Sequence, residues 1–199
     1  TRNMSSAASD VYKRQELRRN ACKPGDVILT TGIHGLSKLG FLIKNKIYLD
    51  NDISLNKRLI SKSIEHFCRP KVYPNFLKNL IKTRSNKKIK RIGCTDSSDG
   101  LFQALQDLAS ASKCKAIINY EKIPKDKDWP RGDKWDEYYF FGGEDYELVF
   151  SLPEKWAENL SKLEKDIKEI GFFADGKPSI EFKNSNKNRL LKNTPFKHF

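Results

Sequence analysis

Two acidic segments flanked by glycine constrain the fold of this chain more than any other feature. The first acidic loop covers residues 96–100 (D-S-S-D-G), and the second acidic loop covers residues 142–147 (G-G-E-D-Y-E). Each of them lies at the edge of an apolar segment. Carboxylates placed against an apolar core cost free energy unless they are paired or coordinated. We therefore expect both loops to lie where the protein binds something cationic.

The residues around the first acidic loop predict a strand followed by a helix. Residues 92–95 form a short apolar run, and residues 101–108 carry leucines at helical spacing. Ser98 or Asp99 would then stand at the helix start, where a side-chain oxygen caps backbone N–H groups. A cap accounts for one aspartate but not for both Asp96 and Asp99. The alternative is Mg²⁺, which takes one or two carboxylates together with phosphate oxygens and water, with a phosphate held at the helix start.

The second acidic loop is less specific by itself. Paired glycines at 142 and 143 let the backbone bend sharply or approach a ligand closely. They place Glu144 and Asp145 just before residues 146–152, whose alternating polarity predicts a strand. A glycine-rich loop with solvated acids would show the same pattern.

The rest of the chain contains short apolar segments, some with the spacing of a helix and some with that of a strand. Strands are expected at 27–31, 92–95, 116–120 and 146–152, and helices at 35–44, 55–67, 75–83, from 101 onward and at 156–170. A polar loop is expected from 122 to 134. The predicted core contains Leu101, Leu105, Leu108, Val149, Phe150, Trp156, Leu160 and Leu163. This order of elements predicts a two-layer α/β or α+β domain.

Composition excludes several functional classes. No apolar run among the 199 residues approaches the length that crosses a bilayer, and no signal peptide is recognisable, so a cytoplasmic protein without a membrane partner is expected. The four cysteines form no C-x-x-C pair, which argues against a zinc ribbon or a disulfide framework and favours buried free thiols. The three histidines are far apart in the sequence, which argues against a histidine metal site.

The formal net charge of +13 has two interpretations. Lysines scattered among asparagines are typical of an AT-rich genome, and the resulting field would still attract anionic substrates such as nucleotides. An RNA-binding module using residues 87–91 is the alternative, but it needs stacked aromatic residues or a single basic stripe, and neither is evident. No nucleic-acid partner is therefore expected.

Residues 1–15 have no apolar periodicity that would connect them to a core. We interpret them as a non-native or disordered N-terminal segment that carries no functional residue.

Taken together, the motifs resemble the thiamine-monophosphate kinase family. In order, they are R-N-A-C-K-P-G-D at 19–26, L-T-T-G at 29–32, R-P at 69–70, D-S-S-D-G-L at 96–101, G-G-E-D-Y-E-L at 142–148 and F-K-H-F at 196–199. The resemblance covers residues 16–199 and corresponds to the C-terminal domain of that kinase. It implies the α+β fold of the aminoimidazole ribonucleotide synthetase-like superfamily, with a mixed, largely antiparallel sheet packed against helices.

The resemblance also implies an activity, the transfer of the γ-phosphoryl group of ATP to thiamine phosphate, which gives thiamine diphosphate. Such a transfer needs positioning and cationic charge rather than a protein nucleophile. Carried over position by position, the resemblance assigns Arg19 and Ser98 to ATP, Asp96 and Asp99 to Mg²⁺, and Glu144 and Phe196 to thiamine phosphate.

The chain departs from the family pattern in three places. The N-terminal domain, which carries most of the family's Mg²⁺-binding aspartates and its dimer interface, is expected to be missing, so this fragment alone should have no turnover although the full-length enzyme is expected to be a homodimer. Ser97 stands where the family has isoleucine, and residues 35–41 replace a run of small residues. Another ATP-dependent enzyme of the same superfamily is the alternative.

Overall fold

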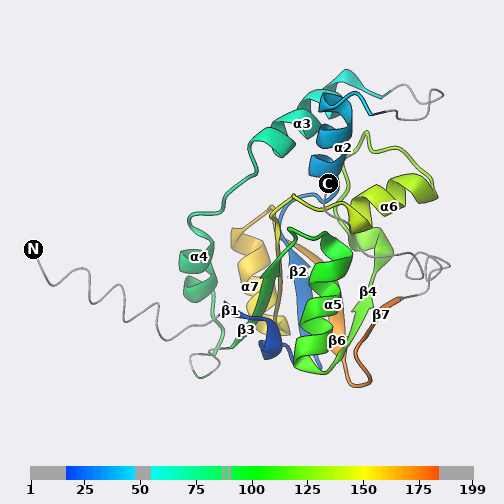
Figure 1. The fold of residues 1–199 in the computed structure, drawn as a ribbon. Coiled ribbons are helices and arrows are strands. Elements are labelled where there is room, and N and C mark those ends of the chain that lie inside the picture. Colours follow the sequence, from blue (N-terminus) through cyan, green and yellow to red (C-terminus); the bar gives the residue numbers. More distant parts are fainter. Residues whose placement is uncertain (1–16, 48–54, 87, 89–90, 184–199) are drawn as a thin grey trace, which may run out of the picture.

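One mixed sheet organises the part of the chain that the computed structural model describes, which is residues 17–47, 55–86, 88 and 91–183. Its order is β1-β3-β5-β2-β6-β4-β7 (Figure 1). The strands are β1 (Leu17–Arg18), β2 (Asp26–Thr30), β3 (Ile92–Asp96), β4 (Lys115–Ile118), β5 (Leu148–Pro153), β6 (Lys168–Ala174) and β7 (Ser179–Phe182). The β1–β3 and β4–β7 pairs are parallel and the other four are antiparallel, which confirms the predicted mixed, largely antiparallel sheet.

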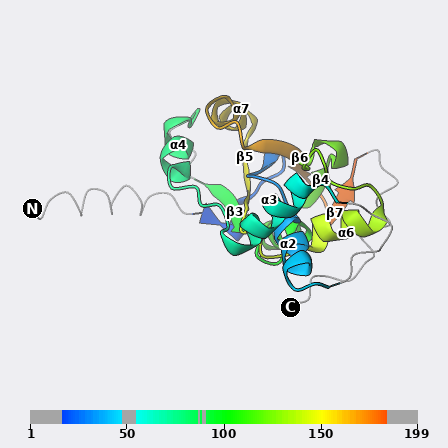
Figure 2. The same cartoon turned by 90° about the horizontal axis from the view of Figure 1, so that it is seen from above.

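Helices cover both faces of this sheet. They are α2 (Leu36–Lys44), α3 (Lys57–Cys68), α4 (Phe76–Lys82), α5 (Leu101–Ser112), α6 (Asp133–Phe141) and α7 (Glu154–Leu163), with short 3₁₀ turns η1 (Arg19–Ala21) and η2 (Tyr120–Lys122). Helix α5 lies in front of the sheet in Figure 1, and α7 lies behind it beside α4. Seen from above in Figure 2, α2 and α3 lie side by side, away from α4 and α7.

Two apolar clusters fill the space between these layers. Successive side chains of a strand point to opposite faces, so Ile28 of β2 joins the cluster that contains α5 and α6, whereas Leu29 joins the cluster that contains α4 and α7. Val149 and Phe150 of β5 divide between the two clusters in the same way. The predicted core residues are buried, with one exception: Leu163, at the end of α7, is 45% exposed.

The helix predicted at 156–170 is too long. Helix α7 ends at Leu163, and the chain turns into β6 at Lys168. Ile167 is buried in the same cluster as Leu160 although it lies outside the helix, so the helical spacing of apolar residues continues across a turn. Periodicity alone does not distinguish these two cases.

Helix α6 is not predicted by the sequence, because residues 122–134 are expected to be a loop and no element is expected between residues 135 and 145. The helix buries Trp135, Tyr139 and Phe140. Aromatic side chains at neighbouring positions of this helix contact each other. The aromatic residues are therefore not confined to one side, and the sequence lacks the apolar stripe of an amphipathic helix.

Two strand predictions also extend too far. The strand expected at 116–120 ends at Ile118, and Tyr120 begins η2. The strand expected at 146–152 begins at Leu148, because Tyr146 has a φ of 54° and leaves the extended conformation.

Helices α2 and α3 approach closely at a glycine. A Cβ atom at Gly40 would lie 2.1 Å from the carbonyl oxygen of Ser63, so no larger residue fits without separating the helices.

All four cysteines are free thiols. Cys22, Cys94 and Cys114 are buried as expected, but Cys68 at the end of α3 is exposed. Every helix within the described ranges is too short or too polar to span a lipid bilayer. Residues 1–15 and Phe196 lie outside the described residues.

Candidate functional site

The two acidic loops lie against each other. The backbone N–H of Glu144 donates to the carbonyl oxygen of Ser98 at 2.8 Å, and the N–H of Ser97 donates to the carbonyl oxygen of Glu147 at 2.8 Å. The Ser97 hydroxyl in turn accepts from the N–H of Glu147 at 3.1 Å and is fully buried. Serine at position 97 therefore provides a bond between the loops that the isoleucine of the family pattern would not.

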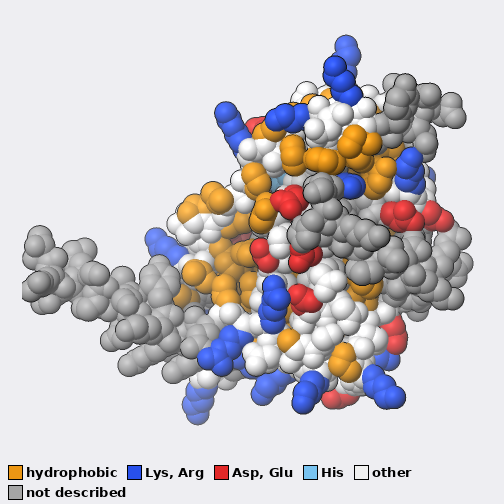
Figure 3. All heavy atoms as spheres, viewed as in Figure 1, with side chains coloured by type: hydrophobic (Ala, Val, Ile, Leu, Met, Phe, Trp, Pro, Cys, Tyr) orange, Lys and Arg blue, Asp and Glu red, His pale blue; other side chains and the backbone are white. Residues whose placement is uncertain are grey.

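Three carboxylates of these loops lie near one exposed phenol, that of Tyr146. Asp96 is the last residue of β3, and the Tyr146 hydroxyl donates to Glu144 at 2.6 Å. That hydrogen bond raises the pKa of Tyr146, and the charges of Glu144, Asp96 and Asp99 raise it further. The structure thus brings three of the predicted site residues within electrostatic reach of a single side chain. Figure 3 shows acidic side chains gathered at the centre of this face.

Unusual backbone conformations hold the second acidic loop. Glu144 and Tyr146 have φ values of 67° and 54°, in the left-handed region that side chains other than glycine rarely adopt. Such strain persists only where surrounding contacts impose it, and it is common at ligand sites.

Helix α5 begins directly after the first acidic loop, at Leu101. Its N-cap residue is Gly100, with a φ of 93°, so the expectation that Ser98 or Asp99 occupies the cap position is wrong. A Cβ atom at Gly100 would lie 3.1 Å from the carbonyl oxygens of Phe140 and Gly142. Glycine is needed here because the second acidic loop passes directly over the helix start.

Arg19, in η1, lies beside the end of β3 where Asp96 is found. Its Nε donates to Thr95 Oγ1 at 3.1 Å, and its guanidinium pairs with Asp107 of α5 at 3.1 Å. The side chain is 57% exposed, which leaves it accessible to a ligand beside Asp96.

Asp145, in contrast, is a structural residue. It is fully buried, and its carboxylate accepts from the N–H groups of Gly35 at 2.5 Å and Ser37 at 2.9 Å, which lie at the start of α2. Burial raises the pKa of Asp145 to about 7, against the lowering effect of these hydrogen bonds. His66 of α3 lies 3.5 Å from the same carboxylate, so one aspartate connects the second acidic loop to α2 and α3.

Glu147 is a second buried acid, and no sequence motif assigns it a role of its own. Its carboxylate accepts from the hydroxyls of Thr31 at 2.5 Å and Tyr73 at 2.7 Å. Burial raises the pKa of Glu147. A Cβ atom at Gly32 would lie 2.0 Å from this carboxylate, so the L-T-T-G motif serves to accommodate Glu147. One sequence signal did point to this burial. Asp145 and Glu147 are two positions apart and come directly before an apolar strand.

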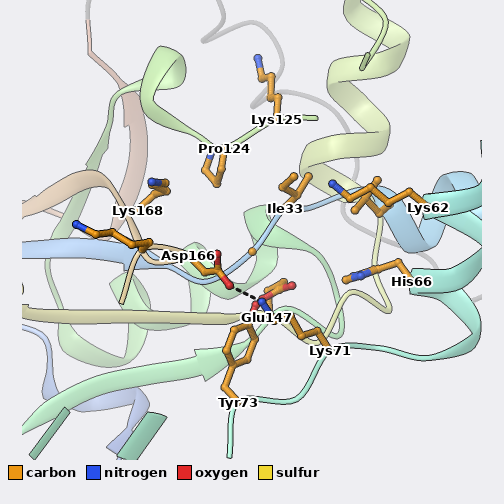
Figure 4. A pocket seen from close by; sticks show the side chains of 13 residues that line it. Ile33, Lys62, His66, Lys71, Tyr73, Pro124, Lys125, Glu147, Asp166 and Lys168 are labelled. Carbon is orange, nitrogen blue, oxygen red and sulfur yellow. Dashed lines mark hydrogen bonds and ion pairs between the residues drawn. The ribbon is translucent and has the colours of Figure 1, made fainter. Parts of the chain in front are cut away.

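Lysines surround a cavity of about 460 Å³ on the other side of Glu147. It is lined by Gly32, Ile33, Leu36, Lys62, His66, Lys71, Tyr73, Pro124, Lys125, Glu147, Lys165, Asp166 and Lys168 (Figure 4). These lysines are spread over more than one hundred residues of sequence, and no motif indicated that they converge.

The donor set at the acidic loops suits Mg²⁺, which binds carboxylate oxygens and fills its remaining positions with phosphate oxygens and water. Among the described residues, however, no group of three or more His, Cys, Asp or Glu side chains is placed to hold a metal ion. His34 and His66 lie close enough for their charges to interact, and the Asp145 carboxylate beside His66 accepts from the N–H of Ser37 at the start of α2.

Comparison with known proteins identifies the domain. Residues 23–182 match the family described as "AIR synthase related protein, C-terminal domain". The chain belongs to this family. A relative from Prochlorococcus marinus named thiamine-monophosphate kinase is 33% identical over 183 residues, which cover 92% of this chain and 55% of the relative. The chain thus spans about half the length of the curated relatives that it matches.

Solved structures agree with the fold of this AIR synthase-related domain. Thiamine-monophosphate kinase from Stenotrophomonas maltophilia superposes with a TM-score of 0.68 at 22% identity, covering 87% of this chain and 54% of that one. The structure of AaThiL complexed with AMPPCP and TMP superposes with a TM-score of 0.66 at 24% identity, covering 93% and 55%. These likenesses confirm the expected fold class.

The buried histidine His34 is expected to make the stability of this domain depend on pH. His34 is fully buried, with its Nε2 2.7 Å from Thr30 Oγ1, and burial, aided by the nearby His66, lowers its pKa to about 3. A folded-state pKa below the unfolded value means that His34 contributes stability above about pH 6.5, and that this stability is lost as the pH falls toward 3. Within this pH range the contribution of His34 to the free energy of unfolding is expected to fall by about 1.4 kcal/mol per pH unit.

Urea unfolding of the wild type and of His34→Gln between pH 7 and pH 4 measures this slope. Asp145 acts in the opposite direction, because its raised pKa means that stability is lost as the pH rises through about 7. Asp145 is present in both proteins, so its effect cancels when the two free energies of unfolding are subtracted. The variant should gain stability relative to the wild type as the pH falls. A difference that is constant with pH would contradict the assignment.

Proposed function

We propose that this chain is the C-terminal part of a kinase that transfers the γ-phosphoryl group of ATP to thiamine phosphate and so forms thiamine diphosphate. The observation that carries the proposal is the hydrogen-bonded contact between the two acidic loops, with Arg19 beside them. The curated relatives named thiamine-monophosphate kinase support it, as does the related structure complexed with AMPPCP and TMP.

In this proposal the exposed guanidinium of Arg19 neutralises phosphate charge, and Ser98 contacts ATP at the start of α5. Asp96 and Asp99 would hold Mg²⁺, whose positive charge, when it is bound, offsets the charge that develops on the phosphate oxygens. No side chain needs to act as a nucleophile.

Glu144 is proposed to bind thiamine phosphate. Its backbone N–H is held by Ser98 and its carboxylate by the Tyr146 hydroxyl, so its position is set before a ligand arrives. Phe196 is proposed to pack on the same substrate. We further propose that the complete enzyme is a homodimer in the cytoplasm.

The two alternatives differ in what supports them. Another ATP-dependent enzyme of the superfamily would share this fold and would differ in its acceptor. The RNA-binding interpretation loses one of its basic residues, because Arg91 makes a two-pronged ion pair with the buried Asp26 and also donates to the carbonyl oxygen of Ala21. Nucleic acid is therefore not part of the proposal.

The test is a phosphoryl-transfer assay on this chain joined to the N-terminal half of a related thiamine-monophosphate kinase. With ATP, Mg²⁺ and thiamine phosphate, we expect thiamine diphosphate, detected by its fluorescent thiochrome derivative. The 199-residue chain alone is expected to give none. A folded, dimeric chimera that uses another phosphate acceptor but not thiamine phosphate would favour the other superfamily enzyme.

A further inference from the structure

The lysine-lined cavity includes Glu147 of the second acidic loop but none of the described residues that are proposed to bind ATP, Mg²⁺ or thiamine phosphate. None of Arg19, Asp96, Ser98, Asp99 and Glu144 lines it. Its lysines come from different parts of the fold: Lys62 from α3, Lys71 from the segment after α3, Lys125 from the segment after η2, and Lys165 and Lys168 from the turn before β6 and its first residue. Figure 4 shows Lys62 and Lys168 on opposite sides of the cavity.

The positive charge in the cavity exceeds the negative charge. Among the described residues, five lysines and two acids, Glu147 and Asp166, line it. Asp166 pairs with Lys71, and Glu147 is buried with a raised pKa while it accepts from Thr31 and Tyr73. The two lining acids therefore carry fewer charges than the five lining lysines.

Partners outside the cavity hold two of the lysines in place. Lys62 pairs with the buried Asp126 at 2.7 Å. The Lys125 ammonium lies 3.6 Å from the centre of the Tyr120 ring and 3.9 Å from a carboxylate oxygen of Asp136. Lys165 and Lys168 make no ion pair with the described residues. Like charges that converge on a concave surface repel each other and focus a positive field, which favours an anion inside.

The cavity also has an apolar wall. Ile33, Leu36 and Pro124 line it together with the ring of Tyr73. Its volume of about 460 Å³ falls in the range of small-molecule sites, roughly 300–1,000 Å³. A ligand that suits both features has an anionic group and a compact organic part.

We propose that this cavity binds a small phosphorylated metabolite. Lysine ammonium groups bind phosphate oxygens as point charges, and several of them together match a dianionic phosphate better than a single carboxylate. The apolar wall takes up the organic part. This second site would let the level of a phosphate ester affect the domain without occupation of the proposed kinase site.

Titration calorimetry of the 199-residue chain with AMP and with inorganic pyrophosphate, without Mg²⁺, tests the proposal. We expect binding of both probes, and at least a tenfold weaker affinity in the double variant Lys165→Ala/Lys168→Ala, whose side chains are exposed and make no ion pair among the described residues. The control Lys82→Ala/Lys177→Ala removes the same charge at exposed positions outside the cavity and should leave the affinity unchanged.

An Arg19→Ala variant separates this site from the proposed kinase site. Retained binding in Arg19→Ala, together with loss in the cavity variant, supports the proposal whatever the outcome of the kinase assay. Loss in Arg19→Ala with retention in the cavity variant would assign the anion to the kinase site and overturn it. Equal weakening in the Lys82/Lys177 control, or no binding of either probe, would overturn it as well.

Discussion

Replacement of Asp96 by asparagine is expected to lower kcat for thiamine diphosphate formation by about 10²–10³-fold in the chimeric kinase. The change removes one negative charge at the end of β3, where Asp96 is proposed to hold Mg²⁺. Metal ions contribute several kcal/mol of charge stabilisation to such transfers, and each 1.36 kcal/mol corresponds to about tenfold in rate. The size of the amide matches that of the carboxylate, so the loop should keep its packing.

Steady-state kinetics at several Mg²⁺ concentrations measures this effect. Partial recovery of the variant at high Mg²⁺ is expected if Asp96 acts through the metal. The matched control is Asp175→Asn, an exposed carboxylate in the segment between β6 and β7, which should leave kcat unchanged. An Asp96→Asn enzyme with wild-type kcat and the same Mg²⁺ dependence would sink the assignment.

Truncation of Trp156 to alanine is expected to reduce the free energy of unfolding by about 3–5 kcal/mol, a large part of the stability of a typical domain. Trp156 is fully buried in the cluster between the sheet and α4. Its indole Nε1 also donates to the carbonyl oxygen of Leu80 at 2.8 Å, which joins α7 to α4. The substitution therefore leaves both a cavity and an acceptor without its donor.

Urea unfolding followed by circular dichroism measures this loss, and two further variants divide it. Trp156→Phe keeps an aromatic ring but removes the donor, and should cost about 1–3 kcal/mol. Leu163→Ala lies on the same helix at a position that is 45% exposed, and should cost less than about 1 kcal/mol. A Leu163→Ala cost close to that of Trp156→Ala would contradict the described end of α7.

Much of the fold was predictable because local patterns and tertiary burial agree. The helices near 36–44, 57–68 and 76–82 carry apolar residues at helical spacing and end where that spacing ends. Helix α6 and the end of α7 were not predictable in this way. In α6 aromatic residues are buried on several sides, and after α7 the buried Ile167 continues a helical spacing in a segment that is not helical.

The sequence by itself determined that two acidic loops flank glycines at the ends of apolar segments, and their residue types restrict the chemistry to cations and phosphates. Tertiary structure decided which acids face solvent. Asp96 and Glu144 remain accessible, whereas Asp145 and Glu147 are buried and bind Gly35, Ser37, Thr31 and Tyr73. It also decided that five lysines converge on one cavity. Neither outcome is visible in the sequence, because both depend on residues from distant parts of the chain coming together, and no local period records such contacts.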